Sequence, residues 1–190
     1  MNDLKLLKYG AIIFFSFPFF LILLCVLICN GSASGESSVV VANSLSLPFT
    51  KEARWSITSK FGSRYDPLNK DGKYHFHNGI DLGAPCGTEV MASANGIIVE
   101  VGHNENGLGN YVYIKHETEM GILYTAYGHM LDDSIVITKD QIVNVGDKIG
   151  SVGSTGYSTG CHLHFSIARD ELSFDKEHTI DPNFVINGLK

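Results

Sequence analysis

The segments GIIVEVG (96–102), NYVYIKH (110–116) and GILYTAYGH (121–129) decide the fold that the sequence predicts. Short runs rich in Val, Ile and Tyr, separated by glycine-rich turns at intervals of roughly a dozen residues, are typical of antiparallel sheets, barrels and sandwiches. The pattern continues in QIVNV (141–145), KIGSVG (148–153) and HLHFSIA (162–168). Asp181-Pro182 is expected to begin one short terminal helix, with Pro in its first turn. We therefore predict an all-β fold, an antiparallel sheet or sandwich with an open groove, preceded by one N-terminal transmembrane helix.

Residues 11–29, AIIFFSFPFFLILLCVLIC, contain no charged side chain. As a helix they span roughly 28 Å, close to the hydrocarbon core of a bilayer. Lys5 and Lys8 precede the run, so the positive-inside rule places residues 1–10 in the cytoplasm and the rest outside the cell membrane. We expect a single-pass anchor at 11–29, a flexible Ser- and Gly-rich linker at 30–50 and a folded domain at 51–190. The alternative is a cleaved signal peptide, although the apolar run is longer than its usual hydrophobic region.

The charge balance excludes one class of partner. The 190 residues include 14 Lys and Arg against 20 Asp and Glu, a net charge of −6. A nucleic-acid surface needs a basic excess, so no nucleic-acid partner is expected. The same deficit gives no attraction to anionic lipid, so the membrane is expected to be contacted through the N-terminal helix only. We expect the chain to act as a monomer.

Two histidines in HLHFSIA form the first candidate site. If this segment is a strand, His162 and His164 leave the same face about 6.6 Å apart. One imidazole can then bind a metal while the other faces a substrate beside it. Spacing alone does not say which histidine does which. The simpler interpretation is two polar positions that alternate with the core residues Leu163 and Phe165.

A second pair lies in HNGID, where His77 and Asp81 are four residues apart. An ideal strand would separate them by about 13 Å, and Asn-Gly disfavours a helix. We expect Gly79 to allow a bend or bulge that brings the two side chains together; the alternative is an ordinary turn followed by an acidic residue. Two imidazoles and one carboxylate leave a fourth zinc position open, as in catalytic zinc sites and unlike structural ones.

Ordered motifs make the chain from about Trp55 to Ile186 similar to the lysostaphin-like, LytM-type zinc endopeptidases that cut peptidoglycan peptides. The motifs are FGSRYDP (61–67), HNGIDLGAPCGTEVMASANGIIVEVG (77–102), YTAYGHM (124–130), VNVGDKIGSVGSTGYSTG (143–160) and CHLHF (161–165). The resemblance covers nearly the whole predicted exported domain. It implies the duplicated hybrid motif fold of that family and zinc-assisted hydrolysis of peptide bonds in stem peptides or cross-bridges.

The family pattern assigns roles that the spacing leaves open. It implies that His77, Asp81 and His164 hold one zinc ion. It implies that His129 of the Tyr-x-His motif and His162 are the two catalytic histidines, without dividing acid, base and oxyanion-stabilising roles between them. No Glu stands beside the histidines as in HExxH, so the histidines must move the protons.

Cys86 and Cys161 both fall inside the shared motifs. Because the ligand-bearing segments around them meet at one metal, the resemblance also implies that the two cysteines lie near each other. In an oxidising compartment we expect a disulfide between them. The alternative, that they are additional zinc ligands, would close the site.

The remaining candidates are expected to play smaller parts. We expect His116, at the end of a strand, to be structural or solvated, His103 and His178 to be surface residues, and His75 to be an outer neighbour of the site. Arg64 either contacts substrate or forms a structural ion pair. Two other functions are a non-catalytic wall-binding scaffold or activator of another hydrolase, and a cytoplasmic sugar-phosphotransferase carrier. The complete ligand set argues against the first, and the predicted export argues against the second.

Overall fold

The computed structural model describes residues 45–65 and 73–187. The expected anchor at 11–29 and the linker up to residue 44 lie outside these residues. Within the described ranges, no helix is both long and apolar enough to cross a membrane. Regular structure there is almost entirely β-strand, with one short helix, so the expected all-β domain is confirmed.

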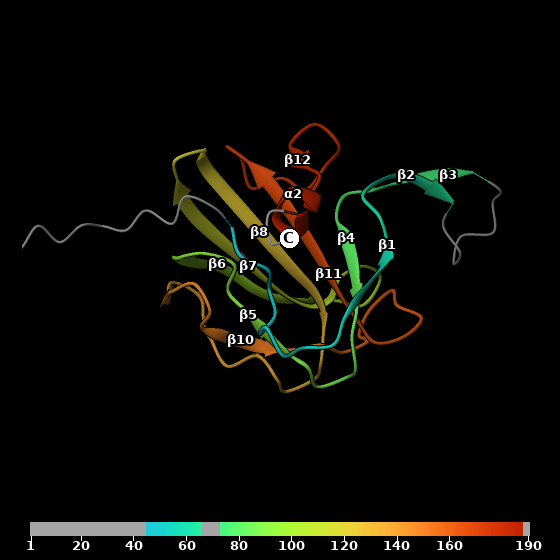
Figure 1. Cartoon of the computed structure of the whole chain (residues 1–190), viewed down its shortest axis with the longest axis horizontal. Helices are drawn as coiled ribbons and strands as arrows, with labels where there is room; N and C mark the ends of the chain where they lie inside the picture. The colour runs from blue at the N-terminus through green and yellow to red at the C-terminus, as the bar shows by residue number, and fades with distance from the viewer. Residues whose placement is uncertain (1–44, 66–72, 188–190) are drawn as a thin grey trace, which may run out of the picture. The chain divides into compact units, whose positions relative to one another are not determined.

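The centre of the domain is an eight-stranded sheet in which all neighbouring strands run antiparallel (Figure 1). Side by side, its strands are β1 (Ser56–Ser59), β4 (Ile80–Gly83), β11 (His162–Arg169), β8 (Gly121–Met130), β7 (Gly109–Thr118), β6 (Gly96–Asn104) and β9 (Ile142–Val143), while β12 (Thr179–Ile180) also pairs with β11. The three segments that predicted the fold form β6, β7 and β8, each slightly longer than expected. The sheet therefore grows from a local β6–β7–β8 meander, and β11 and β4 add to it from distant parts of the sequence.

Two small sheets accompany the large one. One pairs β5 (Glu89–Met91) with β10 (Lys148–Ser151), and the other pairs β2 (Gly62–Tyr65) with β3 (Tyr74–His77). In Figure 1 the β2–β3 pair extends to one side of the large sheet, beside β1 and β4. The predicted terminal helix is α2 (Asn183–Asn187), and Asp181 caps it, since its Oδ1 accepts a hydrogen bond from the Asn183 amide at 2.9 Å.

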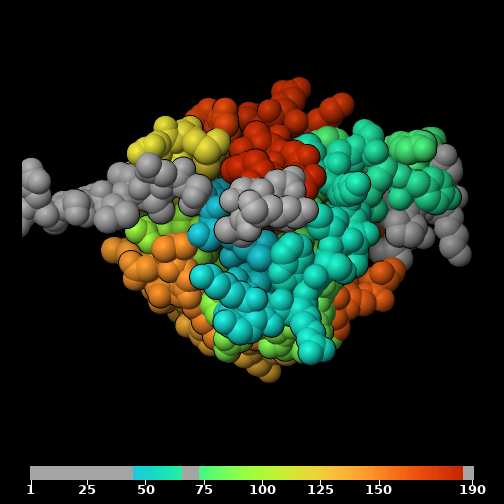
Figure 2. Space-filling model, viewed as in Figure 1, coloured from blue at the N-terminus to red at the C-terminus, as the bar shows by residue number. Residues whose placement is uncertain are grey.

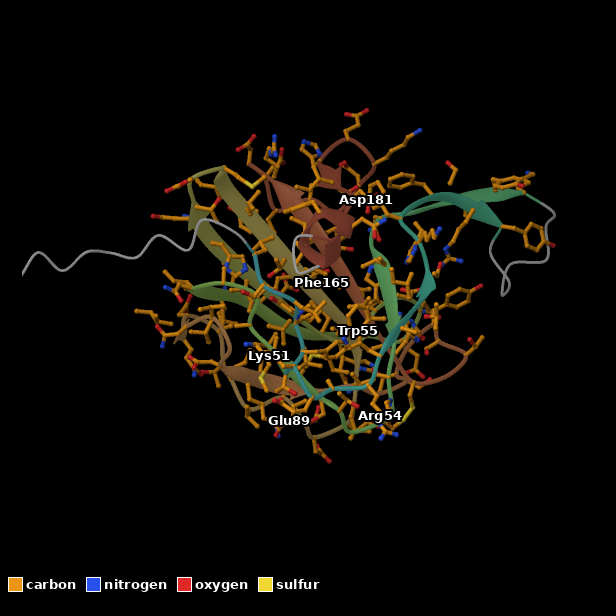
Figure 3. All side chains as sticks on the ribbon, viewed as in Figure 1. Lys51, Arg54, Trp55, Glu89, Phe165 and Asp181 are labelled. Atoms are coloured by element: carbon orange, nitrogen blue, oxygen red, sulfur yellow. A yellow bond between two sulfur atoms is a disulfide. The ribbon has the colours of Figure 1, made fainter. Side chains whose placement is uncertain are left out.

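One hydrophobic cluster joins the large sheet to the β5–β10 pair. Ile98, Ile114 and Phe165 of the large sheet belong to the same buried cluster as Val90 and Ile149 of the small one. The segment before β1 completes this core, because Leu45 and Phe49 are buried in it and Trp55 packs against it. Residues 45–50 therefore belong to the folded domain, and the prediction of a flexible linker up to residue 50 was wrong for them. Figure 3 shows Trp55 on this segment and Phe165 on β11, and Figure 2 shows residues 45–60, in blue and cyan, spread over the face turned to the viewer.

Strand β11 separates this core from the site. Its side chains alternate, so Leu163, Phe165 and Ile167 enter the core while His162 and His164 leave the opposite face. Both faces are nevertheless buried along most of the strand.

Candidate metal centre and active site

The register of β11 with β4 decides which side chains meet. His164 of β11 lies opposite Asp81 of β4, and on its other side it lies opposite Gly128 of β8. His77 is the last residue of β3, and the chain breaks out of strand geometry at Asn78-Gly79 before β4 begins. The Nε2 atom of His77 therefore comes within 3.1 Å of Asp81 Oδ1. The expected bend between the two residues is confirmed.

The bend requires glycine at position 79 because there is no room for a side chain. Its φ angle is not in the left-handed region, but a Cβ placed there would lie 2.4 Å from Ser166 Oγ, 2.6 Å from the Phe165 carbonyl oxygen and 2.7 Å from His164 Nε2. The turn thus packs directly onto β11, which brings His77 beside His164.

Three buried acceptor atoms converge at this point. His77 Nε2 lies 3.1 Å from His164 Nδ1, and His164 Nδ1 lies 3.0 Å from Asp81 Oδ1. His77 donates its Nδ1–H to the Lys60 carbonyl oxygen at 2.9 Å, which leaves an unprotonated Nε2 on the neutral ring. His164 Nε2 is hydrogen-bonded to Ser166 Oγ at 2.8 Å. Two imidazole nitrogens and a carboxylate oxygen within 4.8 Å of one another can hold a metal ion between them, and the remote hydrogen bonds orient both rings for it. The residues present therefore fit a zinc ion.

The two oxygens of the Asp81 carboxylate face different partners. Burial by itself would raise its pKa, but the close contacts with His164 and His77 hold the pKa far below its usual range. While Oδ1 faces the histidines, Oδ2 faces Arg64 Nη2 at 3.7 Å. Thr58 Oγ1 donates to the Asp81 carbonyl oxygen at 3.2 Å, which fixes the backbone from the β1 side. Asp81 is thus a carboxylate held ionised and oriented.

Two further histidines lie next to this set. His162 Nε2 is 3.7 Å from Asp81 Oδ1, and the His129 ring centroid is 4.6 Å from that of His162. His162 donates its Nδ1–H to the Gly160 carbonyl oxygen, and His129 donates its own to the Thr155 carbonyl oxygen, both at 2.8 Å. The neutral form of either ring therefore carries its lone pair on Nε2. Burial lowers the pKa of His129 to about 4, although the hydrogen bond to the Thr155 carbonyl acts in the opposite direction, so the His129 ring is neutral at physiological pH.

An open groove gives access to the site. It is bounded by the β2–β3 pair and by residues 157–159, and His129 and His162 also line it. Tyr65 and Tyr157 border it, with 53% and 46% of their surfaces exposed. The expectation of an open groove is confirmed.

The other sequence candidates lie as follows. His75 lines the groove but does not belong to the converging set. His103 is half exposed, and His178 is a surface residue paired with Asp175 at 2.8 Å. His116 is structural but does not end its strand: β7 continues to Thr118, and the His116 side chain is completely buried.

The backbone acceptors that orient the histidines were not predicted, because carbonyl groups leave no mark in a sequence. Ser166 was also not predicted, although its spacing of two from His164 on a strand was the available signal.

The structure contains a disulfide between Cys86 and Cys161, whose Cα atoms are 5.3 Å apart. It links the turn between β4 and β5 to the residue immediately before β11. It therefore joins the segment that carries Asp81 to the segment that carries His162 and His164.

Buried His and Asp side chains that can hold a metal, beside two more histidines in an open groove, are typical of a metal-dependent hydrolase. The model of peptidase family M23 matches residues 75–182, more than half of the chain, and the chain belongs to this family. M23 enzymes are zinc metallopeptidases, and the set of His77, Asp81 and His164 is suited to that ion.

Known proteins of this kind share both sequence and fold with the chain. The peptidoglycan DD-endopeptidase ShyA of Vibrio cholerae is 38% identical over 118 residues, 61% of this chain and 25% of ShyA. A zinc-containing peptidase from Vibrio cholerae is 32% identical, with a TM-score of 0.58 over 72% of this chain and 38% of that one. The catalytic domain of the antimicrobial peptidase lysostaphin from Staphylococcus simulans is 30% identical, with a TM-score of 0.57 over 70% and 92%. The chain spans 23% to 30% of the length of several curated relatives that it matches.

Proposed function

We propose that this chain is a membrane-anchored zinc endopeptidase that hydrolyses peptide bonds in the stem peptides or cross-bridges of peptidoglycan. The observation that carries the proposal is the convergence of His77, Asp81 and His164 next to two histidines whose Nδ1–H groups donate to backbone carbonyls in an open groove. The relatives that act on peptidoglycan support the substrate class.

In this proposal His77, Asp81 and His164 hold the zinc ion. When bound, the ion supplies Lewis-acid polarisation of the scissile carbonyl and lowers the pKa of a coordinated water. Arg64 holds the second oxygen of Asp81 away from the other ligands.

His129 and His162 move the protons. Because the Nδ1–H of each ring is committed to a backbone carbonyl, each Nε2 is free to accept a proton from the attacking water or, once protonated, to donate one to the leaving amine or to the developing oxyanion. No carboxylate base is needed, since two neutral imidazoles are available.

The groove is suited to an extended peptide. Its two sides come from a β-hairpin and a glycine-rich loop, so a substrate backbone can approach closely between them. Tyr65 and Tyr157 offer exposed aromatic faces for small apolar side chains such as those of alanine.

We further propose that residues 11–29 anchor the chain and that the domain acts as a monomer outside the cell membrane. The apolar run and the preceding lysines support the anchor. The disulfide supports the location, because such bonds persist in oxidising compartments. A cleaved signal peptide would give the same location without the anchor, and mass determination of the membrane fraction distinguishes the two.

The test is digestion of purified peptidoglycan by the full-length chain, with zinc and with a chelator. We expect zinc-dependent cleavage, and mass spectrometry of the fragments identifies the bond. His162→Ala should lower the rate by about 100-fold or more, the usual range for general acid–base catalysis. His103→Ala, at an exposed histidine, is the matched control and should cleave normally. Stoichiometric zinc without cleavage of any wall type would instead indicate a wall-binding scaffold.

A further inference from the structure

One loop supplies both backbone acceptors that orient the two catalytic histidines. The 153–160 loop connects β10 to the strand β11. The Thr155 carbonyl oxygen accepts from His129 Nδ1, and the Gly160 carbonyl oxygen accepts from His162 Nδ1, each at 2.8 Å. The position of this loop therefore determines which nitrogen of each ring carries the proton.

The Thr155 side chain attaches the loop to the large sheet. Its Oγ1 donates to the Met130 carbonyl oxygen at 2.8 Å and accepts from the Asn110 backbone N–H at 2.9 Å. Met130 immediately follows His129, so the hydroxyl contacts the residue next to the histidine that the Thr155 carbonyl orients. Thr155 thus binds β7 and β8 through its side chain and the His129 imidazole through its backbone carbonyl.

The loop fits tightly at this point. A Cβ on Gly156 would lie 2.2 Å from the Gly109 amide nitrogen, and one on Gly109 would lie 2.3 Å from Thr155 Oγ1. The Tyr157 amide donates to the Gly107 carbonyl oxygen at 2.9 Å. Because the backbone of the 153–160 loop lies directly against that of residues 107–109, the loop has little room to move. The Thr155 hydroxyl, which binds both the Met130 carbonyl and the Asn110 N–H, therefore fixes its position.

We propose that Thr155 is a positioning residue: its hydroxyl holds the 153–160 loop where the Thr155 carbonyl fixes the Nδ1–H tautomer of His129. This rests on the proposed function for its catalytic consequence. The active tautomer leaves Nε2 unprotonated toward the groove. Loss of the carbonyl acceptor releases the Nδ1 proton, and the ring can then place it on Nε2, where the ring no longer accepts a proton from water.

The variant Thr155→Val tests this in the full-length, zinc-loaded protein. Valine keeps the branched shape but removes both hydrogen bonds of the hydroxyl. We expect the rate constant kcat to fall by about 10-fold or more, while KM and the bound zinc stay unchanged. Thr155→Ser keeps the hydroxyl and should restore kcat to within about twofold. If Thr155→Val does not fold, Thr155→Ala removes the same hydroxyl without a bulky apolar replacement and takes its place in the comparison.

A spectroscopic measurement distinguishes this proposal from the proposed function. In protein labelled with ¹⁵N-histidine, long-range ¹H–¹⁵N spectra report the tautomer of His129 whether or not the protein cleaves peptidoglycan, with His129→Gln used to assign its signals. We expect the Nδ1–H form in the wild type and in Thr155→Ser, and a mixture or the Nε2–H form in Thr155→Val. An unchanged tautomer in Thr155→Val, an equal loss of kcat in Thr155→Ser, or a loss of zinc in proportion to the loss of activity would each overturn the positioning role. An inactive wild type with the expected tautomers would refute the endopeptidase alone.

Discussion

Replacing Gly79 by alanine is expected to weaken zinc binding and to destabilise the domain at the same time. The added Cβ would lie 2.4 Å from Ser166 Oγ, 2.6 Å from the Phe165 carbonyl oxygen and 2.7 Å from His164 Nε2. A serine hydroxyl can rotate away, but the carbonyl belongs to the central strand β11, so the turn before β4 must move instead. That turn carries His77 at one end and Asp81 two residues beyond Gly79.

The size of both effects follows from these contacts. Overpacking of this kind costs about 1–3 kcal/mol. For a domain of this size that corresponds to a fall in the melting temperature of about 2–12 °C. The Cβ also disturbs the hydrogen bond between His164 Nε2 and Ser166 Oγ, and loss of such an outer contact weakens metal binding by about 10- to 100-fold.

Competition against a chromogenic chelator gives the zinc affinity, and thermal unfolding of the metal-free chain gives the stability. Gly160→Ala is the matched control, because a Cβ there meets no atom within 4 Å, and it should leave both quantities unchanged. A Gly79→Ala variant with wild-type zinc affinity and melting temperature would show that the turn can shift without loss of stability. The packing explanation would then be wrong. Lower stability with unchanged affinity would refute the link to His164.

Three further predictions concern charge. As the pH falls from 6.5 to 4, the free energy of unfolding is expected to decrease by about 3 kcal/mol through His116, because burial lowers its pKa from 6.5 to about 4 while the unfolded chain binds the proton more readily. This contribution to stability is complete above pH 6.5, and urea unfolding of His116→Gln should show a correspondingly smaller pH dependence. Asp81→Asn is expected to abolish stoichiometric zinc binding in equilibrium dialysis, whereas Asp175→Asn, at an exposed carboxylate that also has a lowered pKa, should bind zinc normally; equal zinc contents would exclude Asp81 as a ligand. Arg64→Met is expected to lower the zinc affinity about 10-fold in the chelator assay, because it removes the cation that holds Asp81 Oδ2. Arg64→Lys should have an intermediate affinity. A wild-type zinc affinity in Arg64→Met would show that the ion pair has no role in metal binding.

Much of the fold was predictable from local patterns. The runs of Val, Ile and Tyr at 96–102, 110–116 and 121–129 predicted three strands, and these form the meander at the centre of the sheet. The short strands β2, β3 and β5 were not predicted. Their pairing depends on contacts between residues that are far apart in the sequence, such as Met91 and Lys148. Strands of three or four residues are also too short to show a periodic pattern.

The ligand set was only partly predictable. Alternation placed His162 and His164 on one face, and Asn78-Gly79 indicated a bend between His77 and Asp81. Nothing in the residues themselves said that Gly79 is needed for its small size against β11, since this depends on a strand more than eighty residues away. The resemblance to known endopeptidases assigned the histidines, whereas the hydrogen bonds that orient them came from backbone atoms.

The sequence by itself determined which side chains share a face, because strand alternation is a local property of the backbone. It also determined that two imidazoles and a carboxylate were available for a metal. Only the tertiary structure decided that they meet, since this depends on the register that sets His164 opposite Asp81. The tertiary structure likewise decided which nitrogen of His129 faces the groove, because the Thr155 carbonyl that binds the other nitrogen reaches it from 26 residues away.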